Sequence, residues 1–152
     1  MKKFVGIILF FLFASLQNTM VLAADSQEQA IALVASGKAY LKENGREKAF
    51  AEFSNPTNKQ FHIGDLYLFV YDSKGTTLAH GATPRMIGKN VIDMKDIDGK
   101  YLIKDFIEVT NTKGKGWVDY KWPNPVTKAI QQKSSYVEKV DNDLIIGVGI
   151  YK

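Results

Sequence analysis

Tyrosine, tryptophan and lysine side chains gather in three segments of this sequence that alternate in the manner of β-strands. The segments are LYLFVY at 66–71, GWVDYKW at 116–122 and KSSYVEKV at 133–140. Alternate residues of a strand share a face, which places Tyr120 beside Trp122 and Tyr67 beside Phe69. Tyrosine hydroxyls with one lysine or arginine would suit a small carboxylate. The alternative is that these aromatic residues only fill a core, with their hydroxyls bonded to the backbone.

No other chemistry is indicated by the sequence. It has no G-x-S-x-G, H-E-x-x-H or Walker motif. The absence of cysteine excludes disulfides, a thiol nucleophile and Cys-ligated metals. The two histidines, His62 and His80, leave little for a histidine-rich metal site. The acidic run at 93–98 lacks the ligand spacing of a calcium loop and predicts a solvated turn. We therefore expect no enzyme, no metal and no cofactor.

Helices are predicted first along the chain and strands afterwards. Ser26 and Gln29 have the spacing of a capping box at the start of the first helix. Helices are expected at 26–42 and 46–53. The segment at 101–110 could be a helix or a strand, and the helical spacing of its apolar residues favours a short helix. Strands are expected at 66–71, 76–80, 116–122, 133–140 and 144–151. Between 81 and 100 we expect a long loop with one helical turn near Met94. This order is typical of an α+β domain with one antiparallel sheet of about five strands.

The first 24 residues have the three regions of a secretory signal peptide. Lys2 and Lys3 give a positive start, 4–16 is an apolar run of 13 residues, and small residues end at Ala23 and Ala24. Cleavage after either alanine fits. The alternative is an uncleaved membrane anchor, but the run is short of the about 20 residues that a spanning helix needs. We predict an exported protein, periplasmic or secreted, with one domain at 25–152 and no membrane span after cleavage.

Removal of the leader lowers the net charge. The whole chain has a formal charge of +4, whereas residues 25–152 carry 18 basic and 16 acidic residues. The lysines are spread along the chain and usually have an acidic neighbour. Binding to nucleic acid requires clustered positive charge, so we expect no nucleic-acid partner.

The succession of motifs resembles the single Cache domain of the second type, an extracytoplasmic sensor module of bacterial chemoreceptors and histidine kinases. The resemblance rests on 65–90, G-W-x-x-Y-x-W-x-x-P at 116–125, K-x-x-Y at 133–136 and G-x-G-x-Y at 147–151. It covers nearly the whole chain after the leader. It implies a long N-terminal helix packed on a PAS-like antiparallel sheet, with one ligand pocket on the opposite face under the loops.

The resemblance also implies which residues line that pocket and what they bind. The candidates are Tyr67, Phe69, His80, Arg85, Tyr120, Trp122, Lys133 and Tyr136. A regular strand cannot aim both Lys133 and Tyr136 inward, so one of them is structural. Lys133 is the better carboxylate ligand, and Tyr136 could belong to the core. The expected ligand is a small organic acid, held by Arg85 or Lys133 together with the Tyr120 hydroxyl.

The sequence departs from the receptors in one respect. In receptors the domain lies between two membrane helices, whereas this sequence ends at Lys152, directly after the last predicted strand. We therefore expect any signal to pass to a partner, such as a membrane sensor kinase or chemoreceptor, or the protein to capture a solute. The alternative is an envelope interaction or structural protein whose Cache fold holds no ligand.

Overall fold

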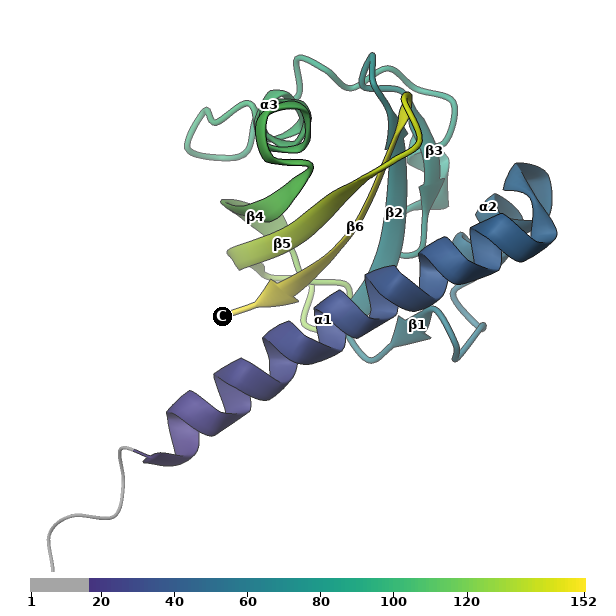
Figure 1. Cartoon of the computed structure of the whole chain (residues 1–152). Helices are drawn as coiled ribbons and strands as arrows, with labels where there is room; N and C mark the ends of the chain where they lie inside the picture. The colour runs from purple at the N-terminus through teal and green to yellow at the C-terminus, as the bar shows by residue number, and fades with distance from the viewer. Residues whose placement is uncertain (1–16) are drawn as a thin grey trace, which may run out of the picture.

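The computed structural model describes the backbone of residues 17–152 and the side chains from Ser26 onward. These residues form three α-helices, one 3-10 helix (η1) and a six-stranded antiparallel sheet (Figure 1). In chain order the elements are α1 (Gln17–Asn44), α2 (Arg46–Phe53), β1 (His62–Ile63), β2 (Leu66–Asp72), β3 (Thr77–His80), η1 (Pro84–Met86), α3 (Leu102–Lys113), β4 (Lys115–Pro123), β5 (Ile130–Val140) and β6 (Leu144–Tyr151). The α+β architecture predicted from the sequence is confirmed.

The strands are ordered β1-β2-β6-β5-β4, and β3 also pairs with β2. Because β2 lies inside the sheet and helices or loops cover both of its faces, Leu66 to Tyr71 are all buried, which explains their unbroken apolar character. The register aligns Tyr120 of β4 with Lys133 of β5, and Lys133 with Tyr151 of β6. Three polar side chains from neighbouring strands therefore stand in one row across the sheet.

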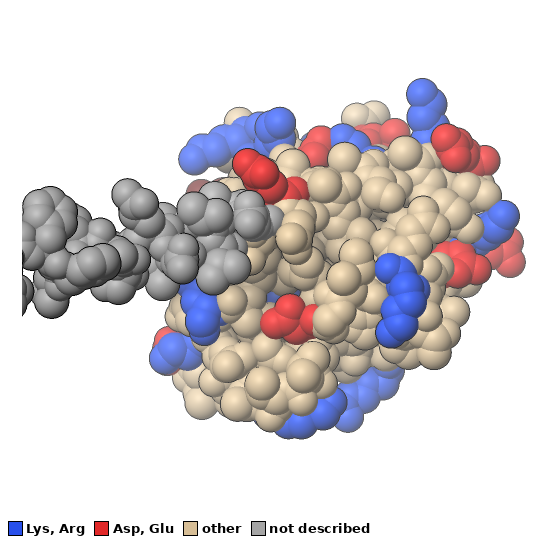
Figure 2. Space-filling model, turned by 90° about the horizontal axis from the view of Figure 1, so that it is seen from below, with Lys and Arg blue, Asp and Glu red and all other residues tan. Residues whose placement is uncertain are grey.

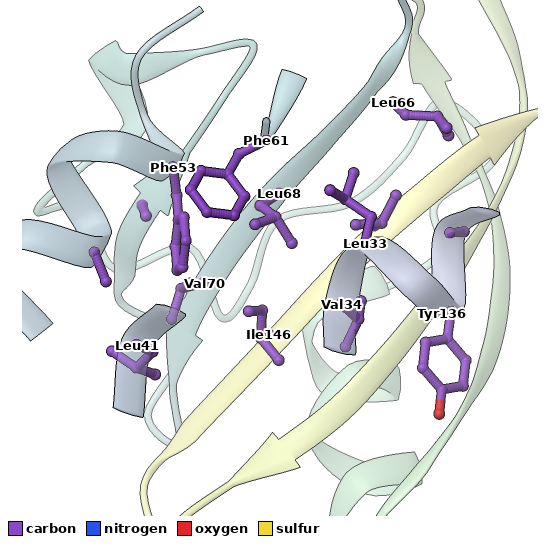
Figure 3. Close-up of a cluster of buried hydrophobic side chains, with 14 of the residues drawn as sticks. Leu33, Val34, Leu41, Phe53, Phe61, Leu66, Leu68, Val70, Tyr136 and Ile146 are labelled. Atoms are coloured by element: carbon purple, nitrogen blue, oxygen red, sulfur yellow. The ribbon is translucent and has the colours of Figure 1, made fainter. Parts of the chain in front are cut away.

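One face of the sheet packs against α1 and α2 (Figure 3). The close-up shows Leu33 and Val34 of α1 near Ile146 and Leu68 of the sheet. Gly37 allows this close approach, because a Cβ there would lie 2.9 Å from side-chain carbons of both Ile146 and Leu68. Burial of each large aliphatic side chain contributes about 1.5–3 kcal/mol to stability. This apolar layer therefore fixes the long helix on the sheet.

The opposite face carries a second core under α3 and the loop at 81–101. Phe106 of α3 stacks on Phe69 of β2, with ring centroids 5.5 Å apart and planes 10° apart. Met86 and Val91 of the loop are buried in the same cluster. Tyr67, Phe69, Tyr71 and Tyr120 of the predicted strands thus face α3 and the loop.

The structure differs from the sequence prediction in three elements. α1 begins at Gln17, so Ser26 lies inside the helix and does not cap it; no proline or glycine interrupts the preceding segment. The helical turn of the long loop is η1 at Pro84–Met86 and not near Met94, since proline at the first position favours it. The sheet has a sixth strand, β1, which is too short for a visible alternation.

The predicted leader falls mostly outside the described residues. Its positions 1–16 are not described, and positions 17–24 are the first turns of α1. Within residues 17–152, no helix is both long enough and apolar enough to cross a membrane.

Candidate functional site

Strand alternation places Lys133 and Tyr136 of β5 on opposite faces of the sheet. Lys133 points to the α3 side, where its Nζ meets the Tyr67 hydroxyl. Tyr136 packs into the core beneath α1, next to Val34 in the same apolar cluster (Figure 3). The predicted opposition of these two residues is confirmed. Tyr136 therefore lies away from the other candidate residues on the α3 face.

Lys133 is the central charged group of this face. It is only 1% exposed, and its Nζ donates a hydrogen bond of 2.6 Å to the Tyr67 hydroxyl. The same Nζ lies 4.1 Å from the ring centroid of Tyr67 and 4.8 Å from that of Tyr151. Burial holds the pKa of Lys133 well below its ordinary value, and the negative charge of Asp65 offsets this in part. Among the side chains described, from Ser26 onward, none forms an ion pair with Lys133.

Two tyrosines enclose the lysine. The hydroxyls of Tyr67 and Tyr151 are 3.3 Å apart, and Tyr151 also donates to the Pro123 carbonyl at 2.9 Å. Burial raises the pKa of Tyr67 well above its ordinary value and that of Tyr151 to about 12. Both phenols are therefore neutral at physiological pH and can act as hydrogen-bond donors.

His80, at the end of β3, lies on the same face of the sheet as Tyr67 and Lys133. It is 2% exposed, and its ring centroid lies 5.1 Å from that of Tyr67. Its Nδ1 accepts a hydrogen bond of 3.0 Å from the Thr83 backbone N–H. Burial, together with the charge of Lys133, lowers the pKa of His80 to about 3. His80 is therefore neutral with its proton on Nε2, which leaves that nitrogen as a donor.

Tyr120 and Trp122 contribute the β4 side. The Tyr120 hydroxyl lies 2.8 Å from the Ser135 hydroxyl, and both residues are buried. Trp122 is half-buried, and its ring meets that of Tyr120 edge-on at 6.1 Å. The Phe106 ring of α3 contacts Tyr120 at 5.6 Å. These aromatic rings form an apolar wall beside the polar row.

Arg85 does not share this environment. It is the middle residue of η1 and is exposed at the surface of the 81–101 loop, whereas its neighbour Met86 is buried. Of the two cations predicted to bind a carboxylate, only Lys133 is buried among the other candidates.

Sequence reasoning missed three residues of this face: Ser135, Tyr151 and Phe106. Ser135 and Tyr151 had a usable signal, because Ser135 alternates with Lys133 and Tyr151 ends the G-x-G-x-Y motif. Phe106 belongs to the helical apolar stripe of α3, and only the packing of α3 on the sheet brings it to Phe69.

The acidic loop at 93–100 has a structural role. The Asp96 carboxylate accepts backbone N–H groups of Asp98, Lys100 and Lys121, at 2.9–3.0 Å. These hydrogen bonds lower the pKa of Asp96 and tie the loop to β4. The side chains described from residue 26 to 152 contain no group of three potential metal ligands.

A surface cleft of about 440 Å³ lies elsewhere, where the end of α1 and the start of α2 meet the β5–β6 turn. Its lining includes Lys38 and Arg46, but Lys38 is paired with Glu138, and Arg46 forms two hydrogen bonds to Asp143 at 2.8 and 2.9 Å. Small-molecule sites place a few fixed polar groups in a mostly apolar enclosure. The α3 face combines a few polar groups with a mostly apolar cluster, whereas Lys38 and Arg46 of this cleft are already paired with acidic residues. Figure 2 shows acidic and basic side chains interspersed on the face seen from below, with uncharged surface between them.

Comparison with known families places the whole described chain in one group. A family model described as single Cache domain 2 matches residues 17–152. The sensor histidine kinase MctS of Rhizobium johnstonii is 36% identical over 88 residues, which are 57% of this chain and 19% of the kinase. The methyl-accepting chemotaxis protein CtpM of Pseudomonas aeruginosa is 32% identical over 109 residues, which are 70% of this chain and 19% of the receptor. The chain thus spans about a fifth of the length of these relatives.

Solved structures share the fold. A methyl-accepting chemotaxis protein from Vibrio parahaemolyticus superposes with a TM-score of 0.76 at 24% identity, over 89% of this chain and 94% of that chain. A Cache chemosensory domain solved for its carboxylic acid recognition gives a TM-score of 0.74 at 22% identity, over 89% of this chain and 99% of that one. At these identities the likeness establishes the fold alone.

Proposed function

The chain belongs to the single Cache domain 2 family, a group of extracytoplasmic, non-catalytic sensor domains, and we propose that it binds a small carboxylate on the α3 face of its sheet. The observation that carries this proposal is Lys133. An amine 1% exposed, with a tyrosine hydroxyl as partner and no ion pair to any side chain from Ser26 onward, is costly in its charged form. A ligand carboxylate would supply the missing negative charge through a charge-assisted hydrogen bond.

The groups around Lys133 favour a ligand with one carboxylate and a short apolar tail. The Tyr67 hydroxyl, the Tyr120 hydroxyl (which can accept from Ser135) and the His80 Nε2–H are neutral donors for carboxylate oxygens, whereas the Tyr151 proton is engaged by the Pro123 carbonyl. Phe69 and Trp122, with the Tyr120 ring, offer an apolar wall for a few carbons. A second carboxylate on the ligand would find no further buried cation among the described residues, because Arg85 is exposed. The Cache chemosensory domain solved for carboxylic acid recognition supports this ligand class by analogy.

Access to the site requires movement of the loop at 81–101. Lys133, His80 and Tyr120 are each less than 5% exposed, and Met86 of the loop is buried over the same face. The Thr83 backbone N–H donates a hydrogen bond to His80, so the loop is held against one of the candidate ligand-binding residues. We infer that the loop opens for the ligand and closes over it. Loops of this kind move without unfolding the scaffold.

We further propose that the protein is exported, to the periplasm or the medium, and acts in signalling or solute capture through a partner. The relatives that share its domain are a sensor kinase and chemoreceptors. A membrane sensor kinase or chemoreceptor is accordingly the partner class that we favour.

The test is a ligand screen of the purified domain with linear C2–C6 carboxylates, by thermal shift and then by calorimetry. A ligand at a hundredfold excess over its dissociation constant should raise stability by about 2.7 kcal/mol. Lys133→Met should abolish this gain, and Arg85→Ala, a matched removal of an exposed cation, should leave it. If no carboxylate gives heat or a thermal shift, the proposal fails.

One observation favours a second candidate, an envelope interaction protein that holds no ligand. Lys133, His80 and Tyr120 each have a hydrogen-bond partner within the chain and pack closely. In that case amines, amino acids and carboxylates would all leave the melting temperature unchanged.

A further inference from the structure

β6 carries two glycines, Gly147 and Gly149, on the face of the sheet that is turned toward α3. Ile145 and Tyr151 flank them at alternate positions; Ile145 belongs to the buried cluster on that face, and Tyr151 is partly buried against it. Neither glycine has a positive φ, so the backbone at both positions suits any residue. Glycine inside a strand weakens it because it packs nothing and loses more chain entropy on folding. A close approach by another group would account for glycine at these positions.

Gly149 lies against the stem of Lys133. In the sheet β6 stands between β5, which carries Lys133, and β2, which carries Tyr67. A Cβ at position 149 would overlap Cε of Lys133, lie 2.9 Å from its Cδ and lie 2.5 Å from the Ser135 hydroxyl oxygen. The lysine chain therefore crosses β6 through the space that a side chain at 149 would fill. Beyond that crossing, its Nζ reaches the Tyr67 hydroxyl at 2.6 Å.

We propose that Gly149 is the positioning residue of the ligand site: its missing side chain forms the notch that directs Lys133 across β6 and holds its amine against Tyr67. The assignment of a ligand to this amine rests on the proposed function, whereas the notch itself does not. Without the notch, the lysine stem would be turned away from Tyr67, and a bound carboxylate would lose its cation.

Gly147 supplies a matched control two residues away on the same strand and face. A Cβ there would overlap the Phe69 ring and lie 2.9 Å from Cγ1 of Val137, with no Lys133 atom among its nearest neighbours. Gly147→Ala should therefore disturb the same core to a similar degree without displacing the lysine.

A double-mutant cycle tests the notch without any ligand. Gly149→Ala should lower the urea midpoint clearly when Lys133 is present, and by less than half as much in a Lys133→Ala background. The residual loss comes from the Ser135 hydroxyl. Gly147→Ala should lower the midpoint equally in both backgrounds. Equal losses from Gly149→Ala in the two backgrounds would overturn the proposal.

Should Gly149→Ala alone fail to fold, the double variant Gly149→Ala/Lys133→Ala carries the test. It should fold, since shortening the lysine vacates the notch, and its failure to fold would also overturn the proposal.

A second measurement is the pKa of Lys133 itself. In protein with ¹³Cε-labelled lysine, the Lys133 signal should titrate far below the other lysines in the wild type and in Gly147→Ala. In Gly149→Ala its pKa should return toward the ordinary value, because the displaced amine reaches water. An unchanged, depressed pKa in Gly149→Ala would contradict the positioning role.

The outcomes separate this inference from the proposed function. With propanoate as probe, binding by the wild type and its loss in Gly149→Ala, together with a positive double-mutant cycle, would support both. A positive double-mutant cycle with no carboxylate binding to the wild type would keep the notch and remove the proposed function.

Discussion

The Nζ of Lys133 on β5 lies 2.6 Å from the hydroxyl of Tyr67 on β2, across the intervening strand β6. This contact joins an amine whose pKa is lowered by burial to a phenol whose pKa is raised by burial. Neither group supplies the negative charge that a buried ammonium needs, so the pair is better suited to receive an anion than to stabilise the fold.

Lys133→Met should therefore make the protein more stable while it removes binding. In the unfolded state the lysine binds a proton below about pH 10.4, whereas in the folded state its pKa is far lower. Between these two values unfolding takes up a proton, so the free energy of unfolding falls as pH decreases from 10 toward 7. Methionine has no titratable group, so this part of the pH dependence of the free energy of unfolding is absent from the variant.

Urea unfolding of both proteins at pH 7, 8.5 and 10 measures the effect. We expect the variant to be more stable at pH 7 by at least about 1.4 kcal/mol, the equivalent of one pKa unit, and the gap to narrow toward pH 10. A variant that is less stable than the wild type at pH 7 would show that the lysine supports the fold.

His80 should make stability fall in acid. Its pKa is about 3 in the folded protein and about 6.5 when unfolded, so below pH 6.5 only the unfolded state gains the proton. The resulting loss is at most about 1.4 kcal/mol per pH unit and ends near pH 3. His80→Asn keeps an oxygen acceptor for the Thr83 N–H but cannot titrate. The stability difference between wild type and variant should shrink from pH 6.5 to 4, and parallel curves would refute the assignment. His62 is present in both proteins, so its effect on the pH dependence cancels in the stability difference.

Tyr120→Phe should weaken carboxylate binding by about 1–3 kcal/mol, because the Tyr120 hydroxyl, which can accept from Ser135, would no longer donate a hydrogen bond to the charged ligand. It should also cost about 1 kcal/mol of stability, because the buried Ser135 hydroxyl loses its partner at 2.8 Å. Calorimetry and urea unfolding measure the two effects. Tyr136→Phe, on the α1 face, is the control and should leave affinity unchanged. Equal losses of affinity in the two variants would place the site elsewhere.

Strand patterns predicted which face of the sheet several candidate side chains occupy. Alternation of side chains between the two faces is a local property of a strand. It therefore predicted that Lys133 and Tyr136 lie on opposite faces and that Tyr120 and Trp122 share a face. The run at 66–71 predicted a strand buried on both faces, and β2 is one. The helix at 46–53 and the helical spacing after 101 correspond to α2 and α3.

The remaining features depend on pairing and packing between distant segments. The partnership of Lys133 with Tyr151 follows from the β5–β6 register, which alternation alone does not define. The exposure of Arg85 depends on how η1 lies on the surface, with Met86 turned inward. The absence of a side chain at Gly149 is explained by the path of the Lys133 stem across β6, which depends on the packing of two strands.

The most direct test of a carboxylate site at Lys133 is the ¹³Cε signal of that lysine during a titration with propanoate at pH 7.5, assigned by its loss in Lys133→Met. Because an anion favours the charged form of the amine, saturation should raise the pKa of Lys133 and move its signal to the ammonium position, while the signals of the surface lysines stay fixed. Binding of propanoate, shown by calorimetry, with an unmoved Lys133 signal would contradict the account.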